Sequence, residues 1–464
     1  MRRSGSLAFL ISVVVAAQAC SSGGTPSAPA SASGSAATTS AAPSAAAEPV
    51  TITLLEHMQL QIDTEKKLIP LFEAAEAKAG KNVTVKLIED VLPDDQFQTL
   101  LTTEFKAGTA PDITSYIPAW VPDFAAAGYL LDLTGRLAAW PDWTQHFYSI
   151  LRDRTVEADG KSYSVPRGGS VIQLFYRKDL LDKWGISTAQ PASWQDFVDR
   201  MNQIKAKNGN NPPFVMPLGS QWGAYFDEGS INVFSGAGAT LYDLSTKKWV
   251  VKSAAISAAF GYMETLIKDG LVPTQDLLSP NPWQPTKYVK FPAGDLQVST
   301  SGAWAWVYDW GPNGAAPIPD LFNKVATWEF PSQSGSPFVY AAEDWRWTIS
   351  AQTKHPDEVF DFLKFMETGT ALAMDNTSVG DPAPRDDQQT VAPYSNYPYL
   401  IAAEKLIPSG KSFVPQLGAG KYGDALGAAE DDLLSGKVTA DQAAAEFQAA
   451  ATQSLGADQV EVAP

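Results

Sequence analysis

The sequence predicts an α/β fold with a mostly parallel sheet, and two observations at the start of the folded part predict it. Residues 50–55 form an apolar, strand-like run, and residues 64–79 carry apolar side chains at helical spacing until Gly80 ends the pattern. Residues 83–87 then alternate as in a second strand. Strands and helices in turn build β-α-β units, which cover a parallel sheet with helices and place ligand sites at the carboxyl ends of the strands.

The same alternation continues along the chain. The further elements that the pattern predicts are a helix over about 94–106, a short strand at 112–116, a strand at 171–176, and helices over 193–204, 253–268 and 357–367 and near the C-terminus. Residues 283–310 are rich in aromatic residues, proline and glycine, which predicts strand ends and loops there.

Composition limits the possible functions. The chain has 464 residues and a net charge of -17, from 34 Lys and Arg against 51 Asp and Glu, and its length suggests two or three structural units. So acidic a protein repels phosphate backbones, and we expect no nucleic-acid partner. One cysteine and three separated histidines, His57, His146 and His355, cannot build a thiolate zinc site or an HExxH site, so we expect no metal and no cofactor.

Residues 1–19 indicate a secretory signal peptide, because a basic start precedes an apolar run at 7–17 that is far shorter than the ~20 residues that span a bilayer. Small residues precede Cys20. This segment resembles the bacterial lipobox, in which the cysteine is lipid-modified, although Ala17 stands where that pattern usually has Leu. An incidental cysteine in an ordinary signal peptide is the alternative. Residues 20–49 are nearly all small or polar and predict a disordered tether.

One glycine pattern suggests a nucleotide, but its context does not fit. Residues 418–423 match GxGxxG, whereas the dinucleotide fingerprint needs a strand before the glycines and a loop with Pro415 stands there. Residues 410–412 lack the first glycine of a P-loop, and the sequence contains no GxSxG nucleophile elbow. The sequence therefore favours neither a nucleotide site nor a serine nucleophile.

Acidic pairs and loop aromatics are the features that could catalyse a reaction or bind a ligand. Asp227-Glu228 and Glu343-Asp344 could supply the carboxylates of a glycoside hydrolase, although sequence neighbours rarely face each other across a scissile bond. Aromatic faces stack on pyranose rings while polar side chains bind the hydroxyls, but a core or hinge role is commoner for any single tryptophan. The loop aromatics are Tyr116, Trp120, Trp222, Tyr225, Trp283, Trp304, Trp306, Trp310, Trp345 and Trp347.

Several short segments follow one another in an informative order. They are T-A-P-D-I-T-S-Y at 109–116, A-G-Y-L-L-D-L at 127–133, G-K-S-Y-S-V-P at 160–166, F-Y-R-K-D-L-L at 175–181, P-A-S-W-Q-D-F at 191–197, F-P-A-G at 291–294 and G-A-W-A-W at 302–306. Over essentially all of residues 50–464, this order resembles the bacterial extracellular solute-binding proteins of carbohydrate ABC importers, with maltose-binding proteins as near relatives. The Y-R-K-D segment departs from the commoner Y-N-K-D.

The resemblance implies a two-lobed periplasmic-binding-protein-like fold (type II), with a hinge between the lobes and a ligand cleft. Matching segments assign residues 50–168 plus 345–385 to the first lobe and 171–340 plus 388–464 to the second. The implied protein is a monomeric lipoprotein on the extracellular face of the bacterial membrane. It would present a sugar to an ABC permease, and the favoured sugar is an oligosaccharide. The resemblance also implies that the protein is not an enzyme. The alternatives are a secreted glycoside hydrolase and a receptor for a polyol, glycerol phosphate or peptide.

The resemblance also implies ligand contacts, position by position. Glu56 and His57 follow the first strand, and Tyr116 ends the strand after Pro-Asp. Trp304 is expected at the carboxyl end of a strand facing the cleft, so that alternation turns Trp306 into the lobe core. The other implied contacts are Trp120, Trp222, Tyr225, Asp344, Trp345 and Tyr422.

Three further positions qualify this site. Asp344 stands where the family usually has Gly, which predicts a more acidic or more crowded cleft. Arg385 could bind a hydroxyl, but a surface pair with Asp386 is favoured. The sequence leaves open whether Trp283 reaches the cleft.

Overall fold

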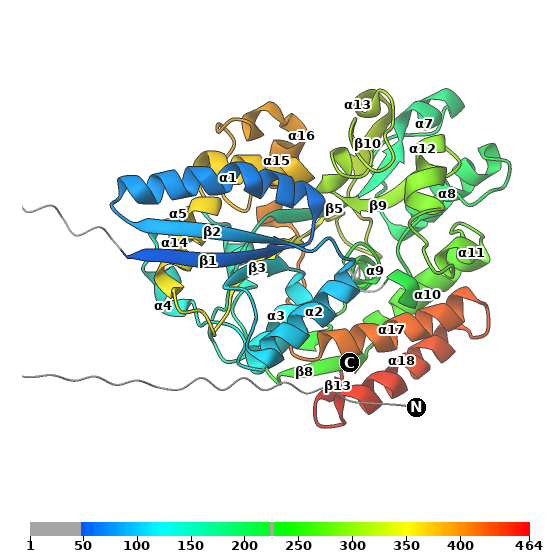
Figure 1. Cartoon of the computed structure of the whole chain (residues 1–464). Helices are drawn as coiled ribbons and strands as arrows, with labels where there is room; N and C mark the ends of the chain where they lie inside the picture. The colour runs from blue at the N-terminus through cyan, green and yellow to red at the C-terminus, as the bar shows by residue number, and fades with distance from the viewer. Residues whose placement is uncertain (1–47, 223–226) are drawn as a thin grey trace, which may run out of the picture. The chain divides into compact units, whose positions relative to one another are not determined.

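Two five-stranded sheets organise this computed structural model, which describes residues 48–222 and 227–464 (Figure 1). In the first sheet the strand order is β2-β1-β3-β12-β4. Strands β1, β2 and β3 are parallel, as the alternation predicts, and β12 is antiparallel to β3 and β4. The strands are β1 (Pro49–Glu56), β2 (Asn82–Glu89), β3 (Ile113–Tyr116), β4 (Ser164–Pro166) and β12 (Arg346–Ile349).

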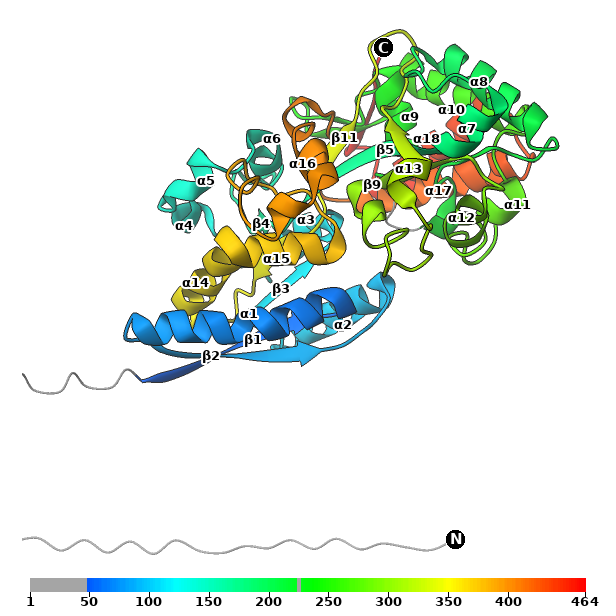
Figure 2. The ribbon, with the colours of Figure 1, turned by 90° about the horizontal axis from the view of Figure 1, so that it is seen from above.

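Helices cover both faces of the first sheet because the side chains of β1 alternate. Ile52 packs on one face with residues of α1 (Gln59–Lys78) and α14 (Pro356–Met366), and Leu55 packs on the other face with α2 (Asp94–Ala107). Both views show α1 running along the β1–β2 pair (Figures 1 and 2). Each fully buried side chain of this size contributes about 1.5–3 kcal/mol to stability.

The second sheet is mainly antiparallel, so the prediction of a mostly parallel sheet is wrong for this part. Its central strand β5 is antiparallel to β9, β10 and β11, and β6 is parallel to β9. The β-α-β argument uses local connections, whereas the partners of β5 come from more than a hundred residues later in the chain. The strands are β5 (Gly169–Arg177), β6 (Phe214–Val215), β9 (Val298–Gly302), β10 (Val325–Trp328) and β11 (Tyr340–Glu343).

Two of the helices packed with the second sheet begin at serine caps. The Ser193 side chain accepts a hydrogen bond from the Asp196 backbone, at the residue where the sequence predicts that a helix begins, and Ser253 caps α10 in the same way. The C-terminal strand β13 (Val460–Val462) completes a small sheet with β8 (Lys248–Lys252) and β7 (Tyr242–Asp243). The helices are α7 (Lys178–Trp184), α8 (Trp194–Lys207), α9 (Ser230–Ala237), α10 (Ala254–Lys268), α17 (Ala419–Leu434) and α18 (Ala440–Leu455).

The chain passes between the two sheets at residues 167–168 and again at Asp344 and Trp345. Helix α16 (Pro398–Glu404) packs beside these crossings, in a small core that contains Val171 of β5 and residues of α15 (Gly369–Val379). The lobe boundaries that the sequence predicts remain a proposal.

Shorter elements complete the described part, in which no helix is long and apolar enough to cross a membrane. They are α3 (Val121–Ala126), α4 (Thr134–Ala138), α5 (Pro141–Gln145), α6 (Ser149–Asp153), α11 (Thr274–Leu277), α12 (Phe291–Ala293), α13 (Leu321–Lys324), the 3-10 turns η1 (Pro118–Trp120), η2 (Ser220–Trp222), η4 (Ala303–Trp306), η5 (Tyr394–Asn396) and η6 (Ile407–Ser409), and the π-turn η3 (Thr286–Lys290). Cys20 and the predicted signal peptide and tether up to residue 47 lie outside the described residues.

Candidate functional site

An aromatic cluster lies at the carboxyl ends of β1 and β3. The ring of His57 stacks on Phe97 at 3.9 Å and lies 5.1 Å from the ring of Trp345. Tyr116 stacks on Trp120 at 5.7 Å, and these two rings belong to the same core. The structure therefore brings four predicted contact residues together, although all four are largely buried against one another. Their ligand contacts stay a prediction.

Glu56 is buried beside this cluster and bonded to the protein itself. Its Oε1 accepts hydrogen bonds from the backbone amides of His57 and Met58, and its Oε2 accepts one from Arg167 Nη1. Burial would raise the pKa of Glu56, but the charge of Arg167 and these hydrogen bonds lower it to about 2. Glu56 is therefore a charged partner of Arg167 in this structure, and its predicted ligand contact stays untested.

Arg167 organises the end of the first sheet, and nothing in the sequence marked it. Its guanidinium donates to both oxygens of Asp375 at 2.8 and 2.9 Å and to Glu65 Oε1 at 2.9 Å. The guanidinium also lies 4.0 Å from the ring of Trp347. Because Arg167 also pairs with Glu56, one cation is shared by three buried carboxylates. Burial and the charge of Glu56 raise the pKa of Glu65.

Trp304 follows the carboxyl end of β9 and lies near a buried group of charged side chains, Lys287, Asp309 and Glu228. Lys287 Nζ lies 5.7 Å from the Trp304 ring and 4.4 Å from the Trp283 ring. The same ammonium contacts Asp309 Oδ2 at 2.8 Å and Glu228 Oε1 at 3.2 Å. The acidic pair had pointed to Glu228, but no sequence signal had pointed to Lys287.

The expectation that strand alternation separates Trp304 from Trp306 is wrong, because β9 ends at Gly302 and both residues lie in the 3-10 turn η4. Both side chains are partly exposed. Trp306 lies 5.2 Å from the ring of the buried Phe175 and stacks on Phe322 at 5.5 Å, so it packs against the core of the second sheet without being enclosed in it. Trp310 is the tryptophan of this segment that is fully buried.

Asp344 lies at the second crossing and is hydrogen-bonded to Asp381. Burial and then the charge of Asp227 raise the pKa of Asp344 to about 8, with Glu228 and Asp94 adding to the effect. Asp344 therefore lies among other acidic groups, and the expectation of a more acidic or more crowded cleft stays a prediction. Asp381 itself was missed, because it lies in a loop far along the chain.

The remaining predicted contacts lie elsewhere or cannot be placed. Tyr422 is buried in the core of the second sheet, where its ring stacks on Trp249 at 4.4 Å and its hydroxyl donates to the Val250 carbonyl at 2.8 Å. Trp222 ends η2, and its side chain and all of Tyr225 fall outside what the structure describes.

Arg385 is buried, and the expected surface pair with Asp386 is wrong. Its guanidinium binds Asp387 and Asp142 and donates to the Glu367 carbonyl. Asp386 instead contacts His146, the residue that follows α5. Fixed by these neighbours, Arg385 is a structural ion-pair partner here.

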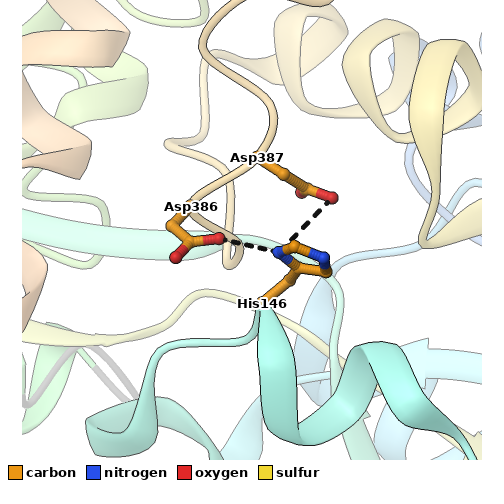
Figure 3. A group of neighbouring side chains, drawn as sticks. All are labelled: His146, Asp386 and Asp387. Atoms are coloured by element: carbon orange, nitrogen blue, oxygen red, sulfur yellow. Dashed lines mark hydrogen bonds and ion pairs between the residues drawn. The ribbon is translucent and has the colours of Figure 1, made fainter.

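His146, Asp386 and Asp387 form the one group of described residues with the spacing of a metal site (Figure 3). His146 Nδ1 lies 3.0 Å from Asp386 Oδ1 and 3.8 Å from Asp387 Oδ2. Both oxygens of Asp387 also accept hydrogen bonds from Arg385. A guanidinium already bound to Asp387 disfavours a second cation at this group.

Comparison with known proteins identifies the fold. The family model described as bacterial extracellular solute-binding protein matches residues 61–369. The multiple sugar-binding protein of Streptococcus mutans is 25% identical over 357 residues, covering 74% of this chain and 78% of that protein.

Solved structures give the same result. The GacH receptor of Streptomyces glaucescens, determined unliganded and with acarbose, superposes with a TM-score of 0.71 at 20% identity, over 88% of this chain and 98% of that chain. The sugar-binding protein MalE of Xanthomonas citri superposes with a TM-score of 0.72 at 19% identity, over 88% and 98%. The fold is therefore the two-lobed α/β fold of MalE-like binding proteins.

Proposed function

Because the chain belongs to the bacterial extracellular solute-binding protein family, we propose that it captures an oligosaccharide between its lobes and delivers it to the permease of an ABC importer. The names of its relatives support the sugar: one binds multiple sugars, and another was solved with acarbose. Binding would favour a closed form, because contacts from both lobes exist only when the hinge closes on the ligand.

One observation carries this proposal. Aromatic rings and carboxyl groups gather where strands of both sheets end, with Trp345 and Asp344 at the crossing and Trp304 just after β9. Rings suit the apolar faces of sugars and carboxylates suit their hydroxyls, so these residue types together support a saccharide ligand.

The enzyme alternative is a secreted glycoside hydrolase, and the proposal excludes it. A relative of the chain is named as a binding protein, which favours a receptor. A hydrolase would instead need a general acid and a second carboxylate on the two sides of the sugar bond that it cleaves. Incubation with oligosaccharides separates the two functions: intact sugar supports a receptor, and released products support a hydrolase.

A thermal-shift screen across sugars, polyols, glycerol phosphate and peptides tests the ligand class. A ligand present at 100 times its dissociation constant adds about 2.7 kcal/mol to the native state. We expect an oligosaccharide to raise the melting temperature most. A rise with another solute class and none with any sugar would contradict the assignment.

Anchoring is part of the proposal. The protein would be a monomer, held on the extracellular face of the membrane by lipid on Cys20 and a tether up to residue 49, after loss of residues 1–19. The lobes would comprise 50–168 with 345–385, and 171–340 with 388–464.

The anchor is tested by Cys20→Ser, which removes the thiol that accepts the lipid. We expect this variant to leave the membrane fraction while its sugar affinity stays unchanged, measured by fractionation and calorimetry. A variant that still sediments with membranes would contradict the lipid anchor.

A further inference from the structure

Acidic side chains gather where the chain crosses between the sheets, and they come from four separate segments. This crossing cluster consists of Asp227, Glu228, Asp309, Asp344 and Asp381. Its members are connected: Asp344 bonds to Asp381, and the charges of Asp227 and Glu228 both act on Asp344. The charge of Asp309 acts on Glu228.

Too few cations face this cluster to neutralise it. Among the described residues, Lys287 is the cation that contacts it, and that ammonium is divided between Asp309 and Glu228. The guanidiniums of Arg154 and Arg167 act on the cluster from further away, and both are bound to carboxylates outside it. Asp227, Asp344 and Asp381 therefore have no cation in contact within the described part of the chain.

Two oxygens of the cluster, Glu228 Oε2 and Asp381 Oδ1, have no hydrogen-bond partner among the described residues. Glu228 is 0% exposed, and its Oε1 accepts hydrogen bonds from Lys287 and from the Ser301 hydroxyl. Its Oε2 is buried and has no hydrogen-bond partner among the described residues. A buried carboxylate oxygen left in this state is costly unless a donor reaches it, so this oxygen can accept a hydrogen bond from a ligand or from water.

Ring surface lies next to the cluster. A Cβ on Gly380, the neighbour of Asp381, would stand 3.0 Å from the Trp304 Cα, so the turn that carries Asp381 packs against η4. Trp304, Asp227 and Asp344 are partly exposed, so the cluster is accessible from solvent at these residues.

The spacing of the oxygens distinguishes two kinds of cation. A metal ion needs at least three ligand atoms close together, and within residues 48–222 and 227–464 this occurs at His146, Asp386 and Asp387 and not at the crossing cluster. An ammonium group on a larger molecule needs fewer converging oxygens, because its N–H donors point in different directions. Together with the neighbouring ring surface, this spacing favours an organic cation.

We propose that the crossing cluster binds a protonated amine carried by the sugar, so that the ligand is an amine-bearing saccharide. This inference rests on the proposed function and narrows its ligand class. The ammonium would donate to Glu228 Oε2 and to the Asp344–Asp381 pair, while a ring of the same molecule packs on Trp304.

Calorimetric titration of the full chain at pH 7 with matched sugars tests the proposal. Glucosamine and the fully deacetylated β-1,4 glucosamine trimer supply amines, and glucose and cellotriose are their neutral counterparts. We expect at least one amine to bind about tenfold more tightly than its counterpart, which corresponds to about 1.4 kcal/mol. Because the contact is ionic, this preference should shrink in 0.5 M salt.

Two variants locate the effect. Asp344→Asn keeps a side chain that can hydrogen-bond to Asp381 but removes the carboxyl group with which an ammonium would pair, and Glu228→Gln does the same beside Lys287. Each should reduce the amine preference, measured as the ratio of the two affinities, about tenfold. Asp424→Asn, on the exposed face of α17, is the matched control and should change neither affinity.

The outcomes separate this proposal from the proposed function. If neutral sugars bind as tightly as their amine counterparts, the amine-binding proposal fails and the sugar receptor stands. If no saccharide binds, both fail. If calcium binds the chelator-treated protein and Asp344→Asn abolishes that binding, the crossing cluster is a metal site and the amine-binding proposal is overturned.

Discussion

Arg167 shows how one buried cation can fix the geometry of a whole strand end. It holds Glu56 of β1, Glu65 of α1 and Asp375 of α15 on one guanidinium, beside the hydroxyl of Ser115 in β3. These elements are distant in sequence, and their common partner aligns the carboxyl ends of β1 and β3. The aromatic cluster at these strand ends depends on that alignment.

Replacing Arg167 by Met should therefore destabilise the protein strongly. The change leaves three buried carboxylates without their cation, and breaking a buried pair in this way costs about 3–5 kcal/mol. Urea unfolding measures the loss. The control is Arg136→Met, which removes an ion pair with the exposed Asp357 and should cost about 1 kcal/mol or less. Equal losses in the two variants would contradict the role given to Arg167.

Helix α18 illustrates a local signal that works without tertiary contacts. The Thr439 side chain accepts from the Gln442 backbone, and the Gln442 side chain accepts from the Thr439 backbone, which together form a capping box. The helix then packs with α10 and α17 around Phe447.

Thr439→Ala should lower the free energy of unfolding by about 0.5–2 kcal/mol, because the orphan amides at the start of α18 lose their acceptor. Chemical denaturation of this variant beside Thr439→Ser checks the cause, since Ser keeps the hydroxyl. A loss of the same size with Ser would show that the methyl group matters and the cap does not.

Sequence patterns predict elements better than they predict where side chains point. The caps at Ser193 and Thr439 and the parallel strands β1 to β3 follow from local signals. The orientation of the Trp304 and Trp306 side chains does not follow from such a signal. Strand β9 ends at Gly302, and the two-residue alternation of side chains ends with it. The crossing cluster depends on contacts between separate segments, such as the hydrogen bond between Asp344 and Asp381, which no local pattern contains.

The acidic character of the whole molecule has a consequence for its stability. Burial raises the pKa of Glu228 and Glu430 to about 7, and burial with the charge of Asp227 raises that of Asp344 to about 8. The pKa of His57 is also raised, because its hydrogen bonds to Asp94 and Glu56 outweigh the opposing effect of burial. The folded protein therefore binds more protons than the unfolded chain between about pH 4.5 and pH 8.

We predict that the unliganded protein is less stable at pH 8.5 than at pH 5.5. Groups with a raised folded pKa stabilise below their unfolded pKa and lose that contribution as pH rises through the folded value. Urea midpoints at the two pH values measure the effect, and Glu430→Gln should reduce the difference because it removes one of these groups. Equal or greater stability at pH 8.5 would contradict the prediction.

The central claim is that one oligosaccharide contacts residues of both lobes, and calorimetric titration of Trp304→Ala and Trp345→Ala tests it most directly. Trp304 follows β9 of the second sheet, and Trp345 precedes β12 of the first sheet. With the best sugar from the screen, each variant should weaken binding by about 1–4 kcal/mol, in the range of aromatic hot-spot truncations. Unchanged affinity in either variant, with both proteins folded, would contradict a ligand held between the lobes.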